Sequence, residues 1–111
     1  MPKYKPESKL KAIRCKISRG GFSGERVFTI TANGVDHSGV GSRFYMWKED
    51  RTPVDEGEPP IGQEIDGLVA ARVLDIDGTT ATVTIPDGDV IEISVGELLD
   101  RPAMDLHVPI G

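Results

Sequence analysis

Cys15, His37 and His107 are the side chains of this sequence whose types could form a nucleophile and its base. A cysteine thiolate attacks a carbonyl carbon once a neighbouring histidine has taken its proton, so a Cys/His pair would indicate covalent catalysis. Cys15, however, lies between Ile13 and Ile17 in an alternating segment, where cysteine behaves as a small apolar core residue. The sequence therefore predicts no catalytic residue, and an enzyme is the least favoured of three functions.

The spacing of potential ligands predicts neither a metal site nor a cofactor. No Cys-x-x-Cys or His-x-x-x-His pair is present, and His37 follows a predicted turn, as an exposed loop histidine does. The acidic residues between Asp50 and Glu58 lack the regular alternation of an EF-hand calcium loop. The glycine-rich run 20–24 lacks the Gly-Lys-Ser/Thr end and the following helix of a phosphate-binding loop, so a hairpin turn accounts for it better.

Four bulky side chains follow one another in the segment Ser42 to Lys48, which we expect to form a strand. Phe44 and Met46 share one face of that strand, whereas Tyr45 and Trp47 share the other. A single core needs only one of these pairs. The second pair lies either at a binding surface, where rigid aromatic residues dominate the affinity, or in a second small core beneath the following loop.

The candidate protein-binding site therefore comprises Tyr45 and Trp47, with Arg43 and Arg26 flanking them. Two arginines beside an aromatic pair would orient an acidic partner. Such a site binds and carries out no chemistry.

Charge is divided unevenly along the chain. Residues 1–26 carry eight Lys and Arg against two acids, whereas the remainder carries five against sixteen, which gives a net charge of −5. A basic arm can bind a phosphate backbone, so the alternative function is that of a nucleic-acid or ribonucleoprotein accessory factor. The residues that would bind nucleic acid are Lys9, Lys11, Arg14, Lys16 and Arg19. Because the whole chain is acidic and repels phosphate, we favour acidic protein surface as the partner of this arm.

Alternating apolar and polar residues predict an all-β protein. The expected strands are residues 10–18, 26–32, 35–40, 42–48, 64–76, 80–85, 89–95 and 104–110. Asn33-Gly34, Asp77-Gly78 and Pro86-Asp87-Gly88 provide the positive φ angles that tight reversals need. The apolar phase changes near Arg72 to Leu74, which predicts a bulge of the kind that bends a strand into a barrel. One helical turn is expected over Gly96 to Asp100.

Length and composition predict one domain. With 111 residues, the chain is long enough for one hydrophobic core and too short for two full-sized ones. We expect a flexible basic tail over residues 1–9 and a single β-barrel domain over residues 10–111, with a mobile acidic loop at residues 49–63. No run approaches the roughly 20 apolar residues of a membrane span, and the first residues lack a secretion signal, so we expect a cytoplasmic protein.

The run from Ile61 to Arg101 resembles an SH3-like barrel of the Tudor and KOW kind. Gly62 opens its first strand, the two Asp-Gly turns follow, and Leu98-Leu99 would plug the barrel after the last long strand. This resemblance implies a superfold that hosts many unrelated functions. The chain departs from the Tudor pattern because Leu68 to Val95 contains no aromatic residue for a peptide-binding cage, and from the KOW pattern because its loops are acidic.

We therefore expect a small SH3-like or related open barrel with an N-terminal β-hairpin extension, acting as a protein-interaction module. The favoured partner is a second copy of the chain. The basic first strand and the acidic remainder are complementary across a two-fold axis, and terminal strands offer unpaired edges.

Overall fold

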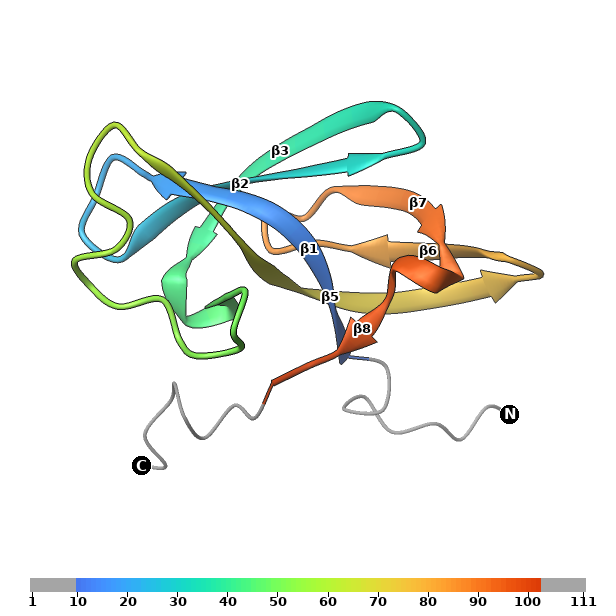
Figure 1. The fold of residues 1–111 in the computed structure, drawn as a ribbon. Coiled ribbons are helices and arrows are strands. Elements are labelled where there is room, and N and C mark those ends of the chain that lie inside the picture. Colours follow the sequence, from blue (N-terminus) through green and yellow to red (C-terminus); the bar gives the residue numbers. More distant parts are fainter. Residues whose placement is uncertain (1–9, 103–111) are drawn as a thin grey trace.

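The computed structural model describes residues 10–102 of the chain (Figure 1). Its elements are β1 (Leu10–Arg19), β2 (Glu25–Ala32), β3 (Val35–Ser42), η2 (Arg43–Tyr45), β4 (Met46–Lys48), β5 (Glu64–Asp77), β6 (Thr80–Thr84), β7 (Val90–Ser94), η3 (Val95–Glu97) and β8 (Leu99–Asp100), where η marks a short 3₁₀ turn. The predicted all-β class is confirmed. No helix within residues 10–102 is long and apolar enough to cross a membrane.

All eight strands of residues 10–102 belong to one curled antiparallel sheet. Its main path runs β3-β2-β1-β5-β6-β7, while β4 pairs with β5 and β8 pairs with β1. One edge of β5 serves two partners, because β4 lies beside residues 67–69 and β6 lies beside residues 72–77. The sheet thereby forms a half-barrel in which the β2–β3 hairpin lies over the β6–β7 hairpin (Figure 1).

Local turn chemistry explains the strand order. Asn33 and Gly34 adopt φ angles of 55° and 77° between the paired residues Ala32 and Val35, which is the geometry of a two-residue type I′ hairpin turn. Gly78 likewise has a φ of 65° in the β5–β6 turn. The predicted bulge is also confirmed, because the register between β5 and β6 shifts between positions 73 and 75.

Two predicted elements differ from the structure. The strand expected over residues 42–48 begins only at Met46, because Ser42 Oγ accepts a hydrogen bond of 3.1 Å from the Phe44 backbone and caps η2. The helical turn expected over residues 96–100 lies at Val95–Glu97, and Leu99–Asp100 pairs with β1 instead. The predicted final strand and basic tail lie outside the described residues.

The main core fills the inside of the curl. It is built from the alternating residues of the paired strands, as the sequence predicts: Ile13, Cys15 and Ile17 from β1, Phe28, Ile30 and Ala32 from β2, Ala81 and Val83 from β6, and Ile91 and Ile93 from β7. Burial of each large apolar side chain contributes about 1.5–3 kcal/mol. This core holds β1, β2 and β5, whose ends position the loops described below.

A second, smaller core lies on the outer face of the sheet. Ala12, Trp47 and Leu68 are buried there, and Ala70 and Leu99 pack against them. A β-bridge also joins Trp47 to a proline of the acidic loop, at position 53. The sequence left open whether the second aromatic pair lies at a binding surface or in a second small core. Trp47 lies in a second small core.

The rim of the half-barrel closes where β3 meets the β6–β7 turn. A Cβ on Gly39 would lie 2.6 Å from Phe28 Cζ and 2.8 Å from Asp87 Cβ. A Cβ on Gly41 would lie 2.9 Å from Pro86 Cβ. Only glycine at these two positions lets the strand and the turn approach this closely.

Candidate functional site

The four residues predicted to bind a protein do not form one exposed patch. Trp47 and Arg26 are both 0% exposed, whereas Tyr45 is 48% exposed and Arg43 is half-buried. The guanidinium carbon of Arg43 lies 4.6 Å from the centre of the Phe44 ring. The assignment of Trp47 and Arg26 to a contact surface is wrong, because neither side chain reaches solvent.

Arg26 is buried because its guanidinium holds the backbone of the acidic loop. Its Nε donates to the Glu58 carbonyl at 2.8 Å, and Nη2 donates to the carbonyls of Glu56 and Asp55 at 2.8 and 3.3 Å. Nη1 donates to the Glu25 carbonyl at 2.8 Å. Four backbone oxygens therefore satisfy this side chain, and its role is structural.

Burial, hydrogen bonds and neighbouring charges shift the pKa values of residues in and beside the acidic loop. Desolvation lowers the pKa of Arg26, and the positive charges of Arg19 and Arg43 act in the same direction. Nearby, Lys48 Nζ lies 2.9 Å from a carboxylate oxygen of Glu58. This hydrogen-bonded pair raises the pKa of Lys48 and lowers that of Glu58.

The acidic loop is held at several further points. Arg19 Nε donates to the Pro59 carbonyl at 2.7 Å, and Arg43 Nη1 donates to the Val54 carbonyl at 3.1 Å. Val54 and Pro59 are themselves buried. We call Arg19, Arg26 and Arg43 the arginine clamp, because each of them binds backbone carbonyls of this loop.

The residues predicted to bind nucleic acid are mostly engaged by other parts of the chain. Lys11 Nζ lies 3.3 Å from Asp100 Oδ1, and Lys16 forms an ion pair with Asp66. The hydrogen bond with Asp66 raises the pKa of Lys16. Arg19 belongs to the arginine clamp.

Arg14 and Lys9 complete that predicted set. Arg14 is exposed on β1, and Lys9 lies outside the described residues. A phosphate backbone reaching β1 would therefore meet an exposed arginine between two lysines that each have a carboxylate partner.

Cys15 and His37 are not arranged as a nucleophile and its base. Burial, assisted by the charge of Asp66, raises the pKa of the Cys15 thiol to about 12. His37 lies on β3, two strands away from Cys15 on β1, which corresponds to roughly 10 Å across a sheet. His107 lies outside the described residues, and within residues 10–102 no group of three His, Cys, Asp or Glu side chains could hold a metal ion.

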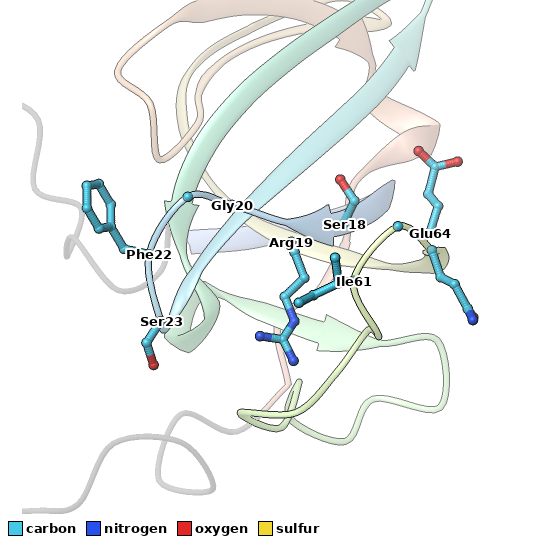
Figure 2. Close-up of a pocket in the computed structure, with 10 residues that line it drawn as sticks. Ser18, Arg19, Gly20, Phe22, Ser23, Ile61 and Glu64 are labelled. Carbon is cyan, nitrogen blue, oxygen red and sulfur yellow. The ribbon is translucent and has the colours of Figure 1, made fainter.

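Sequence reasoning missed a depression of about 800 Å³ at the end of the β1–β5 ladder (Figure 2). Phe22 and Ile61 line it, and with 76% and 85% exposure they are the most exposed large apolar residues in the described part of the chain. Figure 2 shows Phe22 at one end and Glu64 at the other, with Arg19 and Ile61 between them. We call these four residues and the loops that carry them the Phe22–Ile61 surface.

Glycines and one glutamate shape the loop that carries Phe22. Gly20 N donates to the Glu25 carbonyl at 2.9 Å, and Gly21 N donates to Glu25 Oε1 at 2.7 Å. Glu25 N donates to the Phe22 carbonyl at 3.0 Å, which closes the turn. The glutamate therefore occupies the inside of the loop, and the aromatic ring is left outside.

A four-residue turn carries Ile61. Gln63 N donates to the Pro60 carbonyl at 3.0 Å, and Gly62 has a φ of 84°, as the third residue of a type II turn requires. Ile61 is the second residue of this turn, so its side chain is at the tip. The signal for both positions was in the sequence: a large apolar residue sits within a turn, where small and polar residues are the rule.

The two loops are tied to each other. The Arg19–Pro59 hydrogen bond connects the end of β1 to the acidic loop just before the Ile61 turn. Ser23 Oγ adds a hydrogen bond of 3.3 Å to Glu56 Oε2. The Phe22–Ile61 surface is therefore held in place by contacts within the chain.

Tyr45, the exposed member of the predicted aromatic pair, lines a smaller depression of about 280 Å³. Leu10, Ala70 and Pro86 provide its apolar wall, and Arg72 provides a cation. Because it lines this depression, Tyr45 remains a candidate contact residue, whereas Trp47 does not.

A scan against protein-family models finds no match for this chain, and neither does a search of the curated proteins or of the solved structures.

Proposed function

We propose that the protein is a non-catalytic protein-binding module whose contact surface is the Phe22–Ile61 surface. The observation that carries this proposal is that the two most exposed large apolar side chains line the same depression. Exposed apolar side chains that gather on one surface mark protein-contact sites more often than singly scattered ones do. Aromatic residues in such positions contribute strongly to binding energy.

Rigid presentation supports the same proposal. The hydrogen bonds of Glu25 and of the arginine clamp hold both loops on the end of the β1–β5 ladder. A surface that is ordered in advance loses little conformational entropy when it binds. The carboxylate of Glu64 and the guanidinium of Arg19 add one charge of each sign, which would orient the partner.

The other two functions have less support. A thiol that is buried and has a pKa of about 12 is a poor nucleophile at neutral pH. Lysines that already form ion pairs release few counterions from a nucleic acid. We also propose that residues 61–101 are related to the SH3-like barrels of the Tudor and KOW kind, supported by the β5–β6–β7 meander and by Leu98, which packs against the main core.

Affinity capture tests the proposal with a matched pair of double variants. The immobilised full chain is incubated with a lysate of its source cells, and the retained proteins are quantified by mass spectrometry. Phe22→Ser with Ile61→Ser should abolish specific capture. The control is Val35→Ser with Val90→Ser, which removes apolar groups that are 55% and 57% exposed elsewhere on the molecule. Equal capture by wild type and both variants would contradict the proposal.

A photoreactive amino acid at Ser23 provides the second measurement, because this residue is exposed at the edge of the depression. Cross-linking from this position should yield the same proteins that capture retains. The same group placed at Thr79, an exposed turn residue outside the depression, should yield none of them.

A further inference from the structure

We infer that the partner of the Phe22–Ile61 surface is a second copy of this chain, related to the first by a two-fold axis. This inference rests on the proposed function, and it names the partner. A two-fold interface uses the same patch on both copies, so the patch must be complementary to itself. Shape and charge at this surface both meet that condition.

The shape condition is met because the surface contains both a projection and a depression. The Phe22 ring is 76% exposed, and its own loop forms part of the wall of the 800 Å³ depression. A two-fold rotation that places Phe22 of the first copy in the depression of the second copy also places Phe22 of the second copy in the depression of the first. Each ring is then covered by the partner's Ile61 and by the exposed glycine backbone of the partner's loop.

The charge condition is met by Arg19 and Glu64. Glu64 pairs with Ser18 at the end of the β1–β5 ladder, and Arg19 is the next residue along β1. Two-fold rotation brings Arg19 of each copy toward the partner's Glu64 and forms the pair twice. Arg19 donates only Nε to Pro59, and the terminal nitrogens of a guanidinium carry further donors for such a contact.

The net charge of each copy, −5, opposes association at long range. Screening limits this repulsion, because the Debye length at physiological ionic strength is about 8 Å. At the interface itself the charges are balanced, since the depression is lined by Arg19 and Glu64 together with uncharged residues. Local complementarity therefore determines the outcome once two copies meet.

Sedimentation equilibrium of the full chain tests the inference. Wild type should show a concentration-dependent monomer–dimer equilibrium. Phe22→Asp places a carboxylate in the partner's depression and should raise the dimer Kd by about 30-fold or more, the effect of losing an aromatic hot spot. Val90→Asp, at a position that is 57% exposed on β7, should leave the Kd unchanged.

Charge reversal provides a test specific to two-fold pairing. Arg19→Glu and Glu64→Arg each place like charges opposite one another in a homodimer, so each variant alone should dimerise more weakly than wild type. An equimolar mixture should form a heterodimer, because both cross-pairs then carry opposite charges. If Arg19→Glu also lowers the melting temperature, the test rests on Glu64→Arg alone. Added salt screens the repulsion between like charges, so it should restore part of the dimerisation that Glu64→Arg loses.

Failure of the inference can be distinguished from failure of the proposed function. Wild type that stays monomeric at about 1 mM, a concentration that would reveal even weak association, overturns the inference. A dimer that forms equally well with Phe22→Asp also overturns it. If captured proteins still depend on Phe22 and Ile61, the proposed function stands with a different partner, and if they do not, both fail.

Discussion

Arg26 Nε donates a 2.8 Å hydrogen bond to the Glu58 carbonyl, and this links a fully buried guanidinium on β2 to a loop more than thirty residues away. The contact shows how the acidic loop is held: backbone oxygens, and not its carboxylates, face the cation. Together with the Arg19–Pro59 hydrogen bond, it holds the segment before the Ile61 turn against β1 and β2. The candidate binding surface therefore depends on a residue that no partner can touch.

Arg26→Met should destabilise the protein strongly. Methionine fills a similar volume without donors, so the four hydrogen bonds from Arg26 to backbone carbonyls are lost, at an expected cost of about 2–4 kcal/mol. Urea unfolding followed by circular dichroism measures the change. Arg14→Met, at an exposed position on β1, is the matched control and should change the free energy of unfolding by less than about 0.5 kcal/mol. If the two substitutions change the free energy of unfolding equally, the structural role of Arg26 is contradicted.

Trp47→Ala should act on stability and not on binding. The indole is 0% exposed in the second core, and its removal leaves a cavity that costs about 3–5 kcal/mol. Tyr45→Ala, at a residue that is 48% exposed, should cost much less. Native fluorescence offers an independent measurement: emission from Trp47 should resist quenching by iodide until the protein unfolds. Ready quenching of the native protein would contradict the buried position.

Gly39→Ala should destabilise the rim of the half-barrel. The added methyl would lie 2.6 Å from Phe28 and 2.8 Å from Asp87, so either β3 or the β6–β7 turn must move, at a cost of about 1–3 kcal/mol. Gly96→Ala is the control, because its Cβ would meet no atom within 4 Å. Thermal unfolding of both variants decides the matter, and a Gly39→Ala variant as stable as the Gly96→Ala variant would show that the rim is not tightly packed.

The Cys15 thiol should be unreactive in the native protein. Its pKa is raised from 9.0 to about 12 in the folded state, chiefly by burial, so the unfolded chain loses the thiol proton first as the pH rises. Between these pH values the folded state binds more protons, and stability should fall by up to about 1.4 kcal/mol per pH unit. Ellman's reagent at pH 8 should label only urea-unfolded protein. Cys15→Ala should flatten the alkaline part of the stability profile, and rapid native labelling would contradict the burial.

Nucleic-acid binding should be weak and insensitive to the basic strand. Lys11 and Lys16 already have carboxylate partners, so we expect Lys11→Gln with Lys16→Gln to change the affinity for single-stranded RNA or DNA by less than threefold in low salt. Fluorescence anisotropy with a labelled oligonucleotide measures this. A tight complex that weakens steeply with salt, and disappears in the double variant, would restore the alternative function.

Much of the fold was predictable because its signals are local. Asn33-Gly34 specifies its own turn through two positive φ angles, and the alternation in β1, β2, β6 and β7 assigns each side chain to the core or to solvent. The bulge in β5 was visible as a change of apolar phase. The strand expected at residues 42–48 was shortened by a single serine cap, a detail that competes with alternation over the same residues.

The candidate site was predicted less well, because exposure is not a local property. Tyr45 and Trp47 occupy alternating positions in the sequence, yet Trp47 is buried with Ala12 and Leu68 whereas Tyr45 is 48% exposed. Arg26 looks like a surface cation until the loop backbone surrounds it. Phe22 stays outside because Glu25 occupies the inside of its loop.

By itself, then, the amino-acid order determined where the chain reverses and which side chains face the inner core, since φ preferences and two-residue periodicity act between near neighbours. Tertiary structure alone decided which residues a partner can reach. That decision depends on contacts between segments far apart in the chain, above all the arginine clamp on the acidic loop, and the free energy of such contacts is absent from any short window of sequence.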